Sequence, residues 1–381
     1  MIASPHRTLL AATLALATLS AATPAHAWSH QGHILITRLA ALRIIQDPAA
    51  PQPLRDFLKA NMPFSMDDCR RLAAEEVIGA DPQNLAGFDA AATLPDRIQM
   101  TPAGKALLEP YHATEFQMHF VDLEWLSKDP AYKPDLSNRP AIDQIPRDLH
   151  DPRWKLAGYL PFRIDECYKN TVAAFAPDKP LDNDTAVRWA GYLAHYLEDC
   201  HQPHHSTIDY RSFTYLAGKV PGVHEIHTTT SDGKAVTSYK ADSADINVHG
   251  AIEYQLFENA DEPRKTLRQN FWDELTARIE LHAHERAANP PAAFDLHKPY
   301  GGFDRTFELL FDDYEYLPAV GKAGQAGYAT GKFDPSAFFT SEDTIHDQKM
   351  TMIQLIADRN AKAVLEVEAT WRRAWADAHP Q

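Results

Sequence analysis

Apolar residues recur at the spacing of an α-helix along most of this chain, and that period restricts its fold more than any other feature. In residues 33–46 (HILITRLAALRIIQ), for example, the apolar side chains gather on helical faces. The same character predicts further helices at residues 51–62, 67–78, 184–200, 262–288 and 343–376. We expect Asp184 to cap the fourth of these six helices and Pro203 to end it. Thr340 with Asp343 resembles a capping box for the last helix.

One segment departs from the helical period. The runs HEIHTTT and KAVTSYK flank Ser231-Asp232-Gly233, a pattern that predicts a β-hairpin. The Pro-rich stretches 128–153 and 289–301, and the Gly-rich GKAGQAGYATGKF at 321–333, read as loops. The sequence has no internal repeat, glycine-rich phosphate loop or heptad seam. It therefore predicts a mainly α protein, a single helical domain over residues 28–381 with a small inserted β-hairpin.

The first 27 residues have the form of a secretory signal peptide. Arg7 precedes an apolar run at residues 9–19, and Ala25-His26-Ala27 reads as a cleavage site. The run is shorter than the roughly 20 residues that span a bilayer. We therefore expect an exported protein, periplasmic or secreted, whose first mature residue is Trp28; an uncleaved anchor is the alternative.

Charge limits the classes of partner. Of 381 residues, 44% are hydrophobic and 23% charged, which suits a globular chain with ample core. The net charge of −15 lacks the basic footprint that binds phosphate backbones. If nucleic acid is a substrate, bound metal must supply much of the attraction.

The chain has three cysteines, Cys69, Cys167 and Cys200, and no CxxC motif. Export permits disulfides, but an odd number leaves at least one thiol unpaired. We expect Cys69 to pair with Cys167, because Cys200 lies inside the metal motif described next. Spacing alone does not fix the pairing.

Among 19 histidines, the strongest pattern is His195-x3-Asp199-x5-His205. His195 and Asp199 are four residues apart, so one helix face presents both. Pro203 breaks the helix and lets His205 turn back toward that face. Imidazole and carboxylate are ordinary zinc ligands, and a carboxylate can bridge two ions. The alternative is a helix that merely carries many polar residues.

Weaker signals lie elsewhere in the chain. His249 and Glu253 repeat the four-residue spacing. A free α-amine on Trp28, with a pKa near ~8, could reach the same ion as His33. Asp96 in TLPDRI and His119 in MHFVD are unremarkable alone.

Taken in order, these residues resemble the S1/P1 nuclease and zinc-dependent phospholipase C superfamily, from Trp28 to about Glu253. The resemblance implies a mostly helical fold with three zinc ions, in which the mature N-terminal tryptophan binds metal through its amine and carbonyl. The implied ligand sets are Asp96, His119, His195 and Asp199 for one zinc, Trp28, His33 and the bridging Asp199 for a second, and His205, His249 and Glu253 for the third. His204 is the main rival to His205.

The resemblance also implies an activity, hydrolysis of a phosphodiester by metal-activated hydroxide. Asp96 would orient the attacking group or act as the base. No protein nucleophile is required, which agrees with the lack of a GxSxG elbow. Asp122, in the family's His-Phe-x-Asp position, is a candidate to orient a ligand histidine, and we place it with Phe120 among the substrate-binding candidates. Phe120 would stack on a base, although a core phenylalanine is the plainer interpretation.

The substrate class stays open within the superfamily. Trp-x4-His and Leu-Pro-Asp-Arg resemble the nuclease branch, whereas Glu253 and His-Tyr-Leu-x-Asp resemble the phospholipase branch. The predicted hairpin lengthens the segment between His205 and His249 relative to both branches. We favour a nuclease acting on single-stranded DNA or RNA, or on nucleotides. A phospholipase C that releases diacylglycerol is the alternative, and a non-catalytic zinc-binding protein is the third; no stable protein partner is implied.

Overall fold

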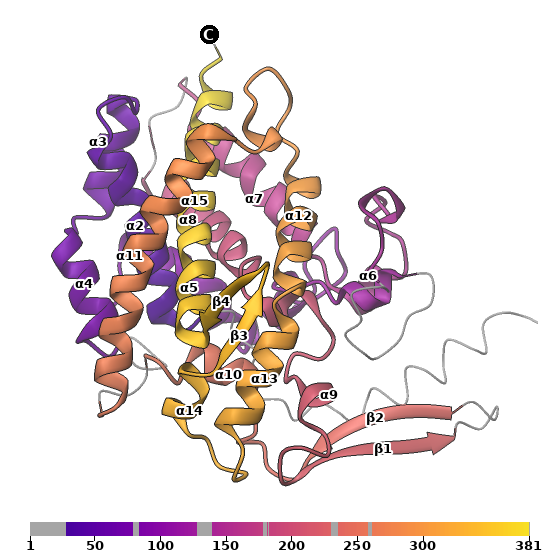
Figure 1. The fold of residues 1–381 in the computed structure, drawn as a ribbon. Helices are drawn as coiled ribbons and strands as arrows, with labels where there is room; N and C mark the ends of the chain where they lie inside the picture. The colour runs from indigo at the N-terminus through magenta and orange to yellow at the C-terminus, as the bar shows by residue number, and fades with distance from the viewer. Residues whose placement is uncertain are drawn as a thin grey trace, which may run out of the picture.

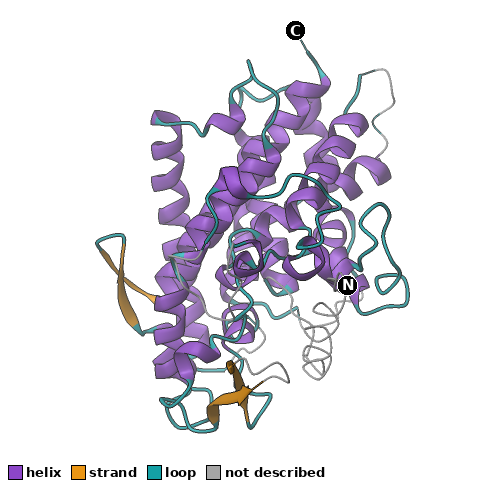
Figure 2. Cartoon of the chain, turned by 90° about the vertical axis from the view of Figure 1, so that its right-hand side faces the viewer, coloured by secondary structure: helices purple, strands orange, loops and turns teal. Residues whose placement is uncertain are grey.

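The computed structural model describes residues 28–78, 84–127, 139–177, 181, 183–229, 235–257 and 261–380. The expected signal peptide, 1–27, and the predicted turn at 231–233 lie outside these residues. The described chain is mainly helical, as predicted, with two small antiparallel hairpins (Figures 1 and 2). None of the described helices has an apolar stretch of the length needed to cross a lipid bilayer.

The helices follow one another in the order α2 (His30–Gln46), α3 (Gln52–Asn61), α4 (Met66–Ala74), α5 (Gly87–Gln99), α6 (Trp154–Ala157), α7 (Leu160–Ala174), α8 (Asn183–Asp199), α9 (Phe213–Leu216), α10 (Val248–Glu253), α11 (Arg264–Ala288), α12 (Gly302–Tyr314), α13 (Leu317–Gly327), α14 (Pro335–Phe339) and α15 (Met352–Ala378). The strands are β1 (Val223–Thr229), β2 (Ala235–Ala241), β3 (Glu342–Ile345) and β4 (Gln348–Thr351). Short 3-10 helices include η1 (Glu115–Met118), η2 (Leu123–Leu126), η4 (Ile142–Gln144), η5 (Pro203–Ser206) and η6 (Ala292–Phe294).

The long helix α15 runs through the middle of the molecule (Figure 1). It packs against α11, α2, α8 and α7. The indole Nε1 of the fully buried Trp371 donates to the carbonyl of Ala190 at 3.0 Å, which ties α15 to α8. Helix α8 also packs against α5, α7 and α2, so its faces are covered by other helices. Residues 190–199 of α8 are all buried, and a polar group in such a place needs a partner.

The start of the last helix was predicted wrongly. Residues 342–345 and 348–351 pair as the hairpin β3–β4, and α15 begins only at Met352. Thr351 caps it, with Gln354 completing the capping box. The turn uses positive φ at His346 (48°) and Asp347 (63°), which matches the primed turns that join two-stranded hairpins. The Thr340–Asp343 pattern resembles a cap, but it precedes a strand.

The glycine-rich segment at 321–333 is also not simply a loop, because its first half lies in α13. Pro318 sits in the first turn, where a missing N–H costs nothing. A Cβ at Gly321 would lie 2.3 Å from Cγ of Tyr215, and one at Gly324 would lie 2.7 Å from Cγ2 of Val248. These glycines allow α13 to approach α9 and α10 closely, and α10 carries His249 and Glu253.

Other expectations hold with small changes. Strands β1 and β2 pair from Val223↔Ala241 to Thr229↔Ala235, and the hairpin projects from the helical body (Figure 1). Helix α8 begins at Asn183, so Asp184 lies within its first turn rather than before it. The helix ends at Asp199, and Pro203 opens η5. The described parts of the Pro-rich stretches are loops interrupted by η4 and η6.

The expected disulfide is absent. Cys69 on α4, Cys167 on α7 and Cys200 after α8 are all buried and unpaired. Burial raises the pKa of the Cys69 and Cys167 thiols to about 12, so both stay protonated at neutral pH. Such thiols behave as small apolar residues of the core. Spacing along the chain gave no information about which helices these residues would join.

A buried ion cluster links α15 to α11 and α12. Glu366, fully buried, accepts from Nε and Nη2 of Arg305 at 2.8 and 2.7 Å and from Nη2 of Arg286 at 2.5 Å. Burial alone raises the pKa of Glu366, but the two guanidinium groups outweigh it and hold the pKa well below its usual range. The resulting stability is present above the ordinary carboxyl pKa and is lost as the pH falls through the lower, folded value.

Replacing this carboxylate should therefore be costly. We expect Glu366→Gln to lower the free energy of unfolding by about 3–5 kcal/mol, because it leaves buried guanidinium charge uncompensated. Urea unfolding at neutral pH measures the change. The control is Glu342→Gln, at an exposed ion pair with Lys349, which should change stability by less than about 1 kcal/mol. Equal effects of the two substitutions would contradict the stabilising role of the buried Glu366 cluster.

Candidate metal centre

One face of α8 carries the centre of the site. His195 and Asp199, four residues apart on this helix, are both fully buried. Asp96 comes from α5, His33 from the first turn of α2, and His119 from the residue after η1. Because α5 and α2 both pack on α8, four segments far apart in sequence deliver their polar side chains to one interior point.

The donor atoms of these residues face one another. Nδ1 of His119 lies 3.0 Å from Oδ2 of Asp199 and 3.6 Å from Oδ1 of Asp96. Nε2 of His195 lies 3.6 Å from Oδ2 of Asp199 and 3.1 Å from Nδ1 of His119. Two overlapping groups, His33–Asp96–His195 and His119–His195–Asp199, each have ligand atoms within 4.8 Å of one another. This arrangement could hold metal ions.

Trp28 and His33 extend the same cluster. The backbone nitrogen of Trp28 lies 3.3 Å from Nε2 of His33, and that Nε2 lies 3.5 Å from Asp96 and 3.8 Å from Asp199. The indole of Trp28 is fully buried and donates to the carbonyl of Glu198 at 3.0 Å. The tryptophan is thus anchored to α8 with its backbone nitrogen directed at the cluster, where the sequence predicted it.

A second group lies nearby. His205 from η5 and His249 and Glu253 from α10 have ligand atoms within 4.8 Å of one another. Nε2 of His249 contacts Oε1 of Glu253, and Nε2 of His205 lies 3.8 Å from the same oxygen. His204, the rival, instead places its Nε2 2.7 Å from the hydroxyl of Ser212. The geometry therefore favours His205.

Hydrogen bonds fix which ring nitrogen faces the site. Nδ1 of His33 donates to Glu198 at 2.5 Å, Nδ1 of His195 to Ala92 O at 2.7 Å, and Nδ1 of His205 to His119 O at 2.5 Å. Each leaves Nε2 as the available ligand atom. Gln202 likewise donates to Glu253 Oε1 at 2.8 Å. The sequence analysis did not predict these hydrogen-bond partners of the site residues. The one pattern that could have indicated such a partner is the glutamate, Glu198, directly before Asp199.

The buried carboxylates around Asp199 explain why this cluster would favour a bound cation. Burial, and then the charges of Asp96, Glu198 and Glu253, raise the pKa of Asp199 far above its usual range, although His33 opposes this. Burial lowers the pKa of His33, but hydrogen bonds to Asp96 and Glu198 outweigh it and raise the pKa to about 10. Several carboxylates packed together without water are costly unless positive charge is added. A cation bound there would displace the His33 proton.

Substitution of Glu198 tests whether the hydrogen bonds that orient the site histidines matter for metal binding. The other carboxylate oxygen of Glu198 accepts from the hydroxyl of Thr37 at 2.7 Å. We expect Glu198→Gln to weaken zinc affinity by about 10- to 100-fold, because the amide is neutral and has one acceptor oxygen in place of the two that serve His33 and Thr37. Competition with a zinc-binding dye measures the affinity. Thr37→Val, which spares the His33 bond, should have a smaller effect, and the exposed Glu280→Gln none; wild-type affinity in Glu198→Gln would contradict this role.

The remaining predicted residues lie beside the site. Phe120 is half-buried, and its ring packs edge-on against Phe116, with centroids 5.3 Å apart. Asp122 donates its backbone N–H to Ala157 O, and within the described chain its carboxylate makes no hydrogen bond to a ligand histidine. His224 pairs with Asp242 on the exposed hairpin, and His201 lies in a separate cavity. A scan against models of known protein families and a search of curated proteins found no match to this chain.

Proposed function

We propose that this protein is an exported zinc-dependent phosphodiester hydrolase of the S1/P1 type. The observation that carries the proposal is the convergence of nine predicted ligand positions on two adjoining buried groups. Three of those positions form one group, and the other six, which include Asp199, form the second. A structural zinc site is normally a single closed tetrahedron rich in cysteine, whereas these donors are imidazole and carboxylate.

The donors fit zinc by their chemistry. Nε2 of His33, His195 and His205 faces the site, and Oδ1 of the fully buried Asp199 makes no hydrogen bond among the described residues. Asp199 has one oxygen toward His33 and the other toward His119, as a bridging carboxylate would. Zinc held here would lower the pKa of water and polarise a phosphoryl oxygen. Asp96, between His33 and His119, would orient the attacking water and accept its proton.

Two aromatic residues close in sequence to His119 support a nucleic acid substrate. Phe116 is 39% exposed and packs on Phe120, the residue directly after His119. Accessible aromatic rings stack on bases of any sequence, at about 1–3 kcal/mol per base. Single strands present unstacked bases to such rings, whereas a duplex does not. Single-stranded DNA or RNA is therefore the proposed substrate class.

The test is paired activity on one preparation. Zinc-loaded protein beginning at Trp28 is incubated with single-stranded DNA, RNA and phosphatidylcholine, each with a chelator control. We expect chelator-sensitive release of nucleotides and intact lipid. Release of diacylglycerol with intact nucleic acid would assign the protein to the phospholipase branch, to which Glu253 points. No hydrolysis of any phosphodiester would leave a non-catalytic zinc-binding protein.

A further inference from the structure

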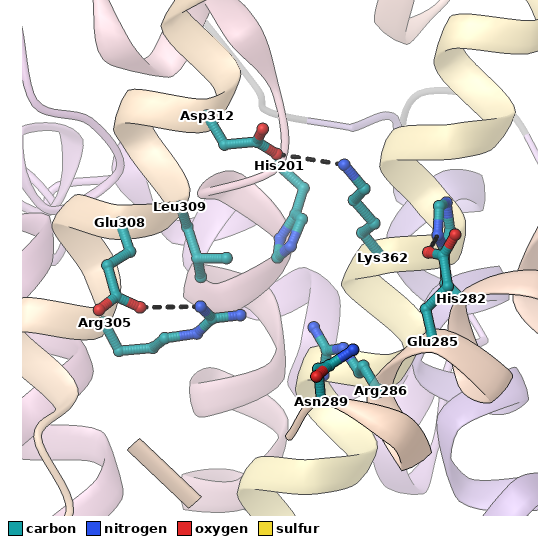
Figure 3. A pocket seen from close by; sticks show the side chains of 10 residues that line it. All are labelled: His201, His282, Glu285, Arg286, Asn289, Arg305, Glu308, Leu309, Asp312 and Lys362. Carbon is teal, nitrogen blue, oxygen red and sulfur yellow. Dashed lines mark hydrogen bonds and ion pairs between the residues drawn. The ribbon is translucent and has the colours of Figure 1, made fainter. Parts of the chain in front are cut away.

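A cavity of about 450 Å³ lies among α11, α12 and α15, with His201 at its inner wall (Figure 3). His201 lies two residues beyond Asp199, just after the end of α8, and its side chain lines this cavity rather than the metal centre. The exposed Asn289 and Glu308 border the cavity, so a small molecule can reach it. Nothing in the proposed hydrolysis uses this space.

The charges that line the cavity cancel. Three cationic side chains, Arg286, Arg305 and Lys362, face three anionic ones, Glu285, Glu308 and Asp312. Each anion already has a partner, because Glu308 accepts from Arg305 at 2.9 Å, Asp312 from Lys362 at 3.3 Å, and Glu285 pairs with His282 at 2.8 Å. A lining without net charge gives little attraction for an ionic ligand.

Two buried polar atoms in this lining have no hydrogen-bond partner among the described residues, Nε2 of His201 and Nη1 of Arg286. The His201 ring is 1% exposed, and its Nδ1 donates to Leu197 O at 2.8 Å. Because Nδ1 carries the proton that it donates to Leu197, the His201 ring offers Nε2 as an acceptor, and Nη1 of Arg286 is a donor.

An unmatched donor and an unmatched acceptor together suit hydroxyl groups, which both accept and donate. Leaving buried polar atoms unmatched lowers stability, and a ligand that bonds to them would recover that loss. Leu309 offers an apolar wall for the carbon face of such a ligand. The cavity lies within the range of about 300–1,000 Å³ typical of small-molecule sites.

We propose that this cavity is a binding site for a small neutral molecule that carries adjacent hydroxyl groups, the chemistry shared by a monosaccharide and the ribose of a nucleoside. His201 accepts from one hydroxyl, and Arg286 donates to another. This site is independent of the proposed hydrolase activity.

The test is calorimetric titration of zinc-loaded protein with glucose, adenosine and inorganic phosphate, separately. We expect glucose or adenosine to bind, which also identifies the source of the hydroxyl groups, and phosphate not to bind at this cavity. Arg286→Met and His201→Phe should each weaken that binding by about 10- to 100-fold. Arg286→Met is tolerable because Glu366 keeps both bonds from Arg305.

His284→Phe, an exposed position on α11, is the matched control and should bind like the wild type. Zinc content measured in each variant separates loss of this site from damage near Asp199. The proposal is overturned if neither neutral molecule binds, if phosphate binds in an Arg286-dependent way instead, or if Arg286→Met binds with unchanged affinity.

Discussion

Asp199→Asn should remove more than one zinc ion and lower phosphodiesterase activity by roughly 1000-fold or more. Asp199 is fully buried, and its two oxygens face His33 at 3.8 Å and His119 at 3.0 Å. An amide keeps the shape but lacks the negative charge and the second oxygen ligand needed for a bridge. Metal analysis by mass spectrometry and a nucleotide-release assay on the same sample measure both effects.

The control for this change is Asp165→Asn on α7, where the half-buried carboxylate pairs only with Lys169 among the described residues. It should keep its zinc and its activity. Circular dichroism confirms that both variants are folded. Retention of all three ions by Asp199→Asn would show that the bridging residue lies elsewhere.

A protein that keeps one extra residue before Trp28 should lose one zinc and most of its activity, by roughly 100-fold or more. The backbone nitrogen of Trp28 lies 3.3 Å from Nε2 of His33, so it is placed to share an ion with that ring. A free amine has a lone pair for the metal, but in a peptide bond the nitrogen is conjugated to the carbonyl. Export followed by signal cleavage would thus complete the site.

The sharpest version of this experiment uses one protein sample. The extra segment carries a protease site whose cleavage leaves Trp28 as the first residue. Zinc content and activity are measured before and after cleavage, and N-terminal sequencing confirms the product. Both should rise on cleavage; full activity before cleavage would rule out Trp28 as a ligand.

Part of the candidate metal cluster could be predicted from the sequence, because its pattern is local or ordered along the chain. Four-residue spacing placed His195 with Asp199, and His249 with Glu253, on single helix faces. The choice of His205 over His204 is also supported by the geometry. What spacing could not reveal is how α2 and α5 dock on α8, which is decided by side-chain packing.

The errors have the same origin. The Thr340–Asp343 pattern has the chemistry of a helix cap, but pairing of residues 342–345 with 348–351 overrides it. The glycines of α13 resemble those of a loop, yet they serve close packing against Tyr215 and Val248. The bond of Glu198 to His33 and the cavity at His201 could not be predicted from spacing. Both depend on how other helices pack around α8 and the turn that follows it.

The most direct test of the metal centre is a crystal structure with anomalous diffraction recorded at the zinc absorption edge, from protein that begins at Trp28. The account predicts three peaks per chain, two of them flanking Asp199 and one between His205, His249 and Glu253. Peaks elsewhere, or none at these residues in zinc-loaded protein, would contradict it.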